Sequence, residues 1–165
     1  MDHLWSPWRF RYVASLGSEE GCVLCRLQSD EEDQKALVLF RGQHGFLVLN
    51  KYPYCTGHLM VVTYRHVATL GEASSEELVE MIRLATDSER ALQAVYKPDG
   101  FNVGFNIGRA AGAGVDGHIH LHVVPRWEGD TNFASVLGET RVLPEDLETT
   151  YNKLHSHFLP KHPKR

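Results

Sequence analysis

Short runs of apolar residues recur along the chain at the spacing of strands. The runs at residues 35–40, 45–50 and 57–63 predict three successive antiparallel strands, and residues 41–44, which include a turn glycine, predict a hairpin between the first two. Two further runs, at residues 101–107 and 118–124, predict a fourth and a fifth strand. The glycine-rich residues 108–117 between them predict a loop.

One long stretch has the period of a helix instead. Ser74 is followed three residues later by Glu77, which is the signature of a capping box, and Pro98-Asp99-Gly100 ends the pattern. The apolar positions at helical spacing between these signals are Leu78, Met81, Ile82, Ala85, Leu92 and Val95. A second, short helix is predicted from Glu145 to about His157.

Residues 118–123 read His-Ile-His-Leu-His-Val, so histidines alternate with apolar residues. Successive side chains of a strand point to opposite faces, which places the apolar residues in a core and His118, His120 and His122 in a row on the other face. Imidazole can act near neutral pH as a nucleophile, a proton carrier or a charge stabiliser. The alternatives are a solvated strand face rich in histidine and a structural metal site that uses two of the three.

Length and composition indicate one ordinary globular domain. The chain has 165 residues, of which 42% are hydrophobic and 23% charged, and its formal net charge of −4 argues against a general nucleic-acid binder. Its start lacks a basic region followed by an apolar stretch, and no eighteen apolar residues run together. We therefore expect a cytoplasmic protein with a small-molecule partner and no contact with nucleic acid or membrane.

Three cysteines cannot form a disulfide framework. Cys22 and Cys25 are close enough in sequence to be a metal-binding or redox pair, or a reduced pair without metal.

Two terminal segments are predicted to flank the globular domain. Residues 1–20 are expected to form an aromatic arm that either packs on the body or contacts substrate, and residues 159–165 to form a basic tail. The domain itself is expected to span residues 21–158.

The run His118-Ile119-His120-Leu121-His122-Val123-Val124 matches the pattern of the histidine triad superfamily, which this chain resembles over roughly residues 20–133. Asn50 and residues 125–130 look most like the branch that contains the fragile histidine triad dinucleoside polyphosphate hydrolases. Residues 5–9 (Trp-Ser-Pro-Trp-Arg) and 126–133 are similar to bacterial members described as diadenosine tetraphosphate phosphorylases or adenylyltransferases. Together with the predicted elements, the resemblance implies an α+β fold with a five-stranded antiparallel sheet, one long helix across it and a short C-terminal helix. It also implies a homodimer.

The resemblance implies roles for particular residues. His120 would attack the α-phosphorus of a nucleotide and form a nucleotidyl-histidine intermediate, with His122 contacting phosphate oxygens and His118 completing the triad. Asn106 would contact phosphate and ribose, although an asparagine there can also cap a turn. The remaining substrate-contacting positions are Asn50, for which turn capping is again the alternative, Gly112, Ala113, Gly114, Val115 and Trp127.

The loop before the histidines has small residues that let backbone N–H groups approach an anion, although a plain flexible connection has the same composition. The family commonly has a polar side chain near Ala113 or Gly114, and this chain does not. Phosphate contacts there would have to come from the backbone.

The resemblance also completes a set of metal ligands. Some relatives add a histidine after the third strand and the first triad histidine to the cysteine pair, which here gives Cys22, Cys25, His66 and His118. Four such ligands suit a structural zinc ion. Magnesium would be bound only with the nucleotide.

The function expected from these residues is nucleotidyl transfer from a dinucleoside polyphosphate, with phosphate or water as acceptor. One rival is a hydrolase of nucleoside phosphoramidates or adenylylated small molecules, which would use the same intermediate. The other is a nucleotide sensor without useful turnover, which would not need His120.

Overall fold

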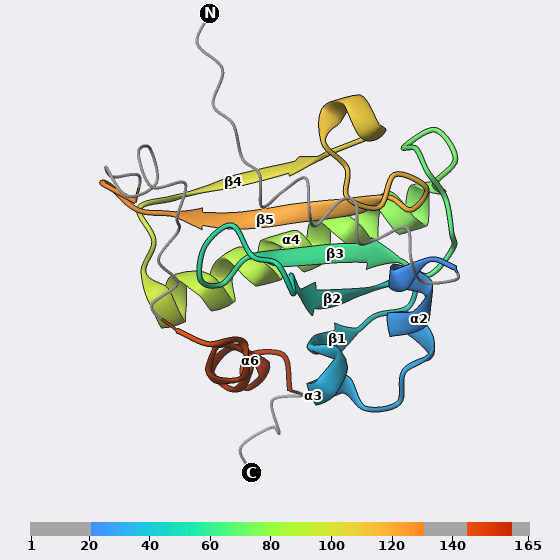
Figure 1. Ribbon diagram of the computed structural model, residues 1–165. Helices are drawn as coiled ribbons and strands as arrows, with labels where there is room; N and C mark the ends of the chain where they lie inside the picture. Colours follow the sequence, from blue (N-terminus) through green and yellow to red (C-terminus); the bar gives the residue numbers. More distant parts are fainter. Residues whose placement is uncertain (1–20, 131–144, 160–165) are drawn as a thin grey trace, which may run out of the picture.

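The structure is a computed structural model that describes residues 21–130 and 145–159 (Figure 1). The predicted aromatic arm and nearly all of the basic tail lie outside these residues, so both stay predictions. Among the described residues, no helix has the length and apolar character needed to cross a membrane.

Five antiparallel strands form one sheet in the order β1-β2-β3-β5-β4. They are β1 (Val38–Arg41), β2 (Gly45–Leu49), β3 (Leu59–Thr63), β4 (Gly100–Phe105) and β5 (His120–Arg126). The predicted hairpin is present between β1 and β2, where Gly42 N–H donates to the Gly45 carbonyl at 2.8 Å. The sequence prediction of a five-stranded antiparallel sheet is confirmed.

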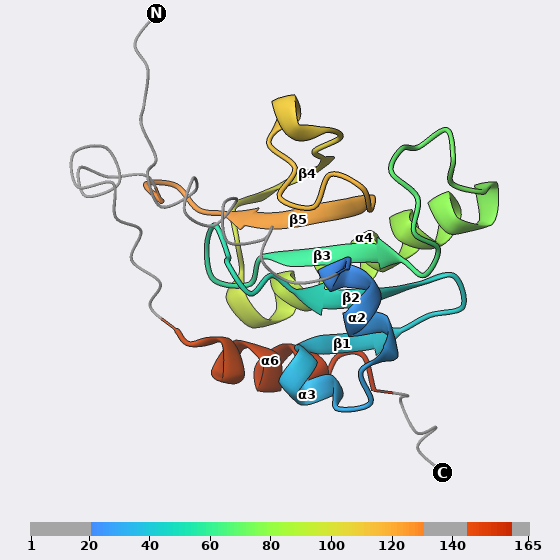
Figure 2. The same cartoon turned by 45° about the vertical axis from the view of Figure 1, so that its right-hand side comes forward.

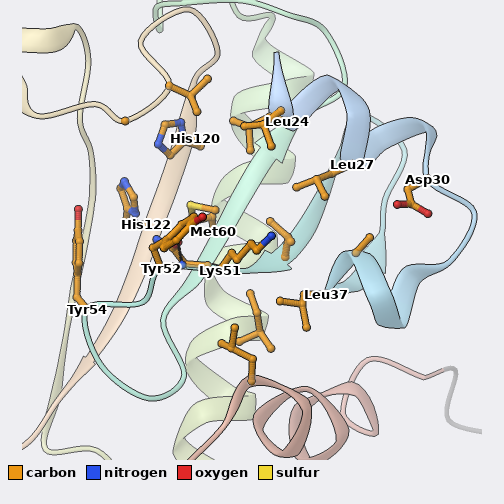
Figure 3. Close-up of a pocket in the computed structure, with 18 of the residues that line it drawn as sticks. Leu24, Leu27, Asp30, Leu37, Lys51, Tyr52, Tyr54, Met60, His120 and His122 are labelled. Atoms are coloured by element: carbon orange, nitrogen blue, oxygen red, sulfur yellow. Dashed lines mark hydrogen bonds between the residues drawn. The ribbon is translucent and has the colours of Figure 1, made fainter. Parts of the chain in front are cut away.

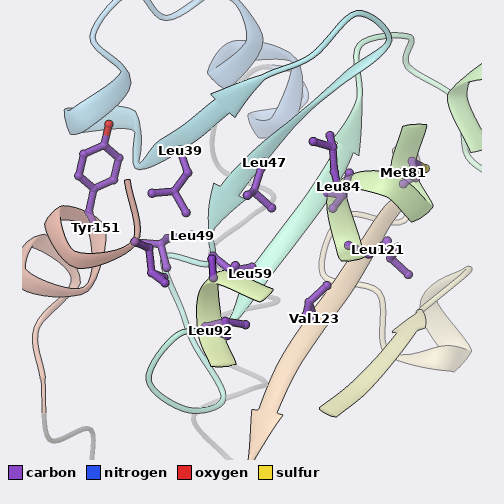
Figure 4. Close-up of a cluster of buried hydrophobic side chains, with 14 residues drawn as sticks. Leu39, Leu47, Leu49, Leu59, Met81, Leu84, Leu92, Leu121, Val123 and Tyr151 are labelled. Atoms are coloured by element: carbon purple, nitrogen blue, oxygen red, sulfur yellow. The ribbon is translucent and has the colours of Figure 1, made fainter. Parts of the chain in front are cut away.

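The long helix α4 (Ser75–Tyr96) covers one face of this sheet (Figure 1). The capping box predicted at its start is present, since the Ser74 hydroxyl and the Glu77 carboxylate each accept the other residue's backbone N–H. Ile82 was predicted to face the core but is 57% exposed, because the buried stripe runs through Met81, Leu84 and Ala85 instead. Strand residues that meet this stripe include Leu47, Leu49, Leu59, Val61, Leu121 and Val123 (Figure 4).

The other face of the sheet is covered at one end by two short helices, α2 (Val23–Ser29) and α3 (Asp33–Ala36) (Figure 2). Leu24 and Ala36 from these helices pack with Phe46, Val48 and Val62 of the strands. Neither helix follows from the apolar pattern. The predicted first strand at residues 35–40 is therefore wrong at its start: residues 33–36 are helical, Leu37 has a left-handed backbone (φ 60°), and the strand begins at Val38.

The last described helix, α6 (Leu147–His155), lies beside the edge strand β1 (Figures 1 and 2). Asp146 caps its start by accepting the Thr149 N–H at 2.7 Å, and the Tyr151 hydroxyl donates to the Val38 carbonyl at 3.2 Å. The predicted short C-terminal helix is confirmed, and it leaves β4 as the edge strand that no described helix covers.

Candidate active site

A cavity of about 310 Å³ lies on the face of the sheet that α2 and α3 partly cover (Figure 3). Apolar side chains from α2, α3 and the strands form one end of it, and His120 and His122 line the other. The polar and charged lining residues are Asp30, Lys35, Asn50, Lys51, Tyr52, Tyr54, His120 and His122. A lining that is mostly apolar, with a few polar groups at one end, is typical of a small-molecule site.

His120 reaches the cavity because of the register of the sheet. Val62 of β3 lies opposite His120 and Met60 lies opposite His122, so the two imidazoles and the apolar residues under them share one face. The His120 Nδ1–H donates to the backbone carbonyl of His118 at 2.8 Å. This contact leaves the lone pair on Nε2, which has no hydrogen-bond partner among the described residues.

Burial lowers the pKa of His120, and the hydrogen bond to the His118 carbonyl opposes this shift in part. The ring is therefore neutral at pH 7. A neutral imidazole with a fixed tautomer and an unengaged Nε2 is a competent nucleophile.

His122 belongs to a chain of hydrogen bonds that starts at the backbone. The Tyr54 N–H donates to His58 Nδ1 at 3.1 Å, and His58 Nε2 lies 2.9 Å from His122 Nδ1. Asn50 points its side-chain nitrogen at the same His58 Nδ1, at 3.3 Å, while its oxygen accepts the Tyr52 N–H at 2.9 Å. Two donors thus face His58 Nδ1, so its hydrogen sits on Nε2 and is donated to His122.

The same chain fixes the tautomer of His122. Because His122 Nδ1 accepts the hydrogen bond from His58, the hydrogen of a neutral His122 ring is on Nε2. That N–H is the group of His122 that a ligand oxygen would contact. Asn106, the residue after β4, lies with its side-chain nitrogen 3.5 Å from this atom. No other residue that the structure describes makes a hydrogen bond to the Asn106 amide, so a half-turn of the amide would present its accepting oxygen to the N–H.

The sequence patterns described above did not point to His58. Its side chain is fully buried. The strand register explains the contact between His58 and His122. Met60 lies opposite His122, and His58, two residues before Met60, is therefore the diagonal neighbour of His122 on the same face of the sheet.

The predicted substrate-contacting residues do not all reach the cavity. Asn50, Gly112, Gly114 and Val115 line it, while Ala113 is buried beside it. Trp127 is not part of the lining, and its indole N–H donates to the Tyr96 carbonyl at 3.4 Å. Asn50 also makes the turn-capping contact that was its alternative reading, through its bond to the Tyr52 N–H.

His118 faces a different group of side chains from its two neighbours. It precedes β5, its ring is absent from the cavity lining, and its Nε2–H donates to the Thr63 carbonyl at 2.9 Å. Through its own carbonyl it holds His120, so its contribution to the site is one of positioning. Burial, with His66 and His120 as weaker causes, lowers the pKa of His118 and keeps its Nδ1 unprotonated.

That Nδ1 completes a four-residue cluster with Cys22, Cys25 and His66, whose ligand atoms all lie within 4.8 Å of one another. His118 Nδ1 is 3.4 Å from the Cys22 sulfur and 3.5 Å from the Cys25 sulfur, and His66 Nδ1 is 3.2 Å from the Cys25 sulfur. Tetrahedral zinc with ordinary bond lengths separates sulfur from nitrogen ligands by about 3.5 Å. Burial and the neighbouring Cys22 raise the pKa of the Cys25 thiol, and a bound cation would reverse this preference.

The histidine alternation, the sheet and the Cys/His cluster define a histidine triad protein. Residues 31–129 match the family model described as the HIT domain, so the chain belongs to this family, as the sequence pattern predicted. It is 38% identical over 157 residues to a Mycobacterium tuberculosis protein named AP-4-A phosphorylase, an alignment that covers 91% of this chain and 80% of that protein.

Solved structures agree on the fold. A zinc-bound histidine triad family protein from Mycobacterium smegmatis superposes with a TM-score of 0.67 at 26% identity, covering 84% of this chain and 93% of that one. A Plasmodium falciparum diadenosine triphosphate hydrolase superposes with a TM-score of 0.64 over 93% of this chain and 97% of that one, at 17% identity. The second similarity concerns the fold alone.

Proposed function

We propose that this protein is a nucleotidyl transferase that acts on dinucleoside polyphosphates through a covalent nucleotidyl-His120 intermediate. The observation that carries the proposal is the state of His120: its Nδ1–H is held by the His118 carbonyl, and its Nε2, at the cavity, has no hydrogen-bond partner within residues 21–130 and 145–159. The 38% identity to a protein named AP-4-A phosphorylase supports the substrate class.

In the first step His120 Nε2 attacks the α-phosphorus, and a nitrogen–phosphorus bond forms as the bond to the bridging oxygen breaks. The electron pair of that bond leaves with the departing nucleotide. The ring gains positive charge, which the His118 carbonyl stabilises through Nδ1–H. The His122 Nε2–H is placed to donate to a phosphate oxygen, and such positioned donors are typically worth about 10²- to 10³-fold in rate.

In the second step an acceptor oxygen attacks the same phosphorus and releases His120. With diadenosine tetraphosphate, inorganic phosphate gives ADP plus ATP, and water gives AMP plus ATP. We propose phosphate as the preferred acceptor, supported by the name of the M. tuberculosis relative and by the loop backbone at Gly112 and Gly114, which lines the cavity. Arg109 and Arg126 support it less, because each is paired with a carboxylate, Asp116 and Asp130 respectively.

Product analysis with and without millimolar phosphate tests this proposal. We expect phosphate to convert the products from AMP plus ATP to ADP plus ATP. We also expect His120→Ala to lose at least about 10⁴-fold in kcat while still binding substrate, because the nucleophile is lost and the cavity remains. Turnover of adenosine phosphoramidate but not of diadenosine tetraphosphate would overturn the proposed substrate class.

We further propose that Cys22, Cys25, His66 and His118 hold a structural zinc ion. The set is closed, with four protein ligands and no position left for substrate. The Thr63 carbonyl accepts the Nε2–H of His118 and so directs its Nδ1 lone pair to the cluster. Bound there, the ion would fix the segment that includes α2 to the start of the histidine strand. Magnesium would enter only with the nucleotide, because Asp30 is the single carboxylate that the described part of the chain contributes to the cavity lining.

We also propose a homodimer formed through β4. This edge strand carries Val103, which is 44% exposed, and Ile107 follows it at 38%. An exposed apolar edge strand is a template for pairing with another chain. Sedimentation of wild type and of Val103→Lys tests this, since the proposal requires a dimer that the charged variant weakens.

A further inference from the structure

Lys51 is a charged residue that lines the cavity but has no role in the proposed reaction steps. It lies two residues after the end of β2, lines the cavity, and extends its ammonium group between the histidines and the apolar end (Figure 3). The other charged lining residues are engaged: Lys35 pairs with Glu32, and Asp30 accepts the Glu32 N–H at 2.9 Å. The Lys51 ammonium has no hydrogen bond or ion pair with any residue that the structure describes.

The position of Lys51 along a bound nucleotide follows from the two ends of the cavity. A nucleotide whose α-phosphorus lies at His120 has its base at the apolar end, which Leu27, Ala36 and Leu37 line. The ribose must then lie between them, where Figure 3 places Lys51 and Met60. In an in-line displacement the leaving group lies on the opposite side of the phosphorus from the attacking nitrogen. The rest of the polyphosphate is therefore attached at the α-phosphorus, facing away from His120, and does not lie beside the ribose.

An ammonium group beside a ribose has a recognisable chemical use. Neutral ribose hydroxyls need only polar partners, whereas a cation pairs best with an anion. Dinucleotide-binding proteins use the same device, accepting a 2′-phosphate through a cationic side chain at the ribose. We propose that Lys51 makes this cavity selective for nucleotides that carry a second phosphate on the ribose 2′- or 3′-hydroxyl. This inference rests on the proposed function, because it assumes that a nucleotide occupies the cavity.

Calorimetric titration with three ligands tests the inference: AMP, adenosine 2′,5′-bisphosphate and adenosine 3′,5′-bisphosphate. For wild-type protein we expect one bisphosphate to bind about 2- to 5-fold more tightly than AMP, which is the scale of an exposed charge pair. The preferred isomer identifies the hydroxyl. Lys51→Met should remove this advantage and leave AMP affinity within about 3-fold, while Lys51→Arg should keep it.

Lys35→Met is the matched control, because Lys35 lines the same cavity but is already paired with Glu32. It should keep the bisphosphate advantage. The inference is overturned if neither bisphosphate binds more tightly than AMP, or if the advantage persists in Lys51→Met. AMP binding keeps the two proposals apart: if AMP itself fails to bind wild type, the proposed function fails, and if AMP binds without a bisphosphate advantage, only the role of Lys51 fails.

Discussion

His58 Nε2 lies 2.9 Å from His122 Nδ1, and this contact determines which nitrogen of His122 can face a substrate. His58 is itself fixed by two donors, the Tyr54 backbone N–H and the Asn50 amide. A fully buried histidine outside the triad thus sets the proton position of a histidine inside it. Groups that orient a catalytic or ligating imidazole in this way typically contribute about 10- to 100-fold.

Replacing His58 tests that relationship. We expect His58→Ala to lower kcat by about 10- to 100-fold with a smaller change in KM, because His122 loses its orientation while the cavity remains. His58→Gln, whose amide can still donate to His122, should recover part of the loss. His157→Ala removes an exposed histidine two residues beyond the end of α6 and serves as the control. Equal losses in His58→Ala and His58→Gln, accompanied by a matching fall in melting temperature, would indicate that His58 only fills space.

The pKa of His120 predicts the acid side of the pH profile. An exposed histidine titrates near 6.5, and burial lowers the pKa of His120 below that value. Protonation would occupy the Nε2 lone pair, so kcat/KM should be constant from about pH 8 to near 6.5 and fall only below it. A midpoint at or above 6.5 would show that another group controls the acid limb.

Stability must be measured over the same range, and its sign follows from the same shift. Below pH 6.5 the unfolded chain binds a proton at this histidine that the folded chain does not. The free energy of unfolding therefore decreases as the pH falls. Circular dichroism at each pH separates this loss from the loss of the nucleophile.

The metal cluster gives a prediction about folding. Protein purified without chelator should contain one zinc ion per chain, and Cys22→Ser or Cys25→Ser should lower the melting temperature more than it lowers kcat, because a closed site couples metal binding to stability. Cys55→Ser is the matched control, since the Cys55 sulfur contacts the Pro125 carbonyl and lies outside the cluster. Metal-free protein with an unchanged melting temperature would contradict the proposed structural zinc site.

The sequence predicted those elements and sites whose residues follow a regular period or a known spacing. The capping box at Ser74 and the alternation from His118 to Val123 each predicted an element, because backbone geometry imposes those periods. The metal set was also predictable: Cys22 and Cys25 have a recognisable spacing, and the family pattern supplied His66 and His118.

The rest depends on contacts that no local pattern records. The single turn of α3 leads into β1 through Leu37 with its left-handed backbone, and an apolar run there cannot be told from a strand. His58 reaches His122 only through the pairing of β3 with β5, which joins residues 64 positions apart. The separation of the His118 ring from those of His120 and His122 arises because β5 begins only at His120.

The central claim is that His120 forms a covalent bond to the α-phosphorus, and the stereochemical course of the reaction tests it most directly. A substrate with an isotopically chiral thiophosphate at the α position reports each in-line displacement as one inversion. Two displacements, first by His120 and then by phosphate or water, predict net retention of configuration at phosphorus. Net inversion would mean that the acceptor attacks the substrate directly, and it would contradict a nucleotidyl-His120 intermediate.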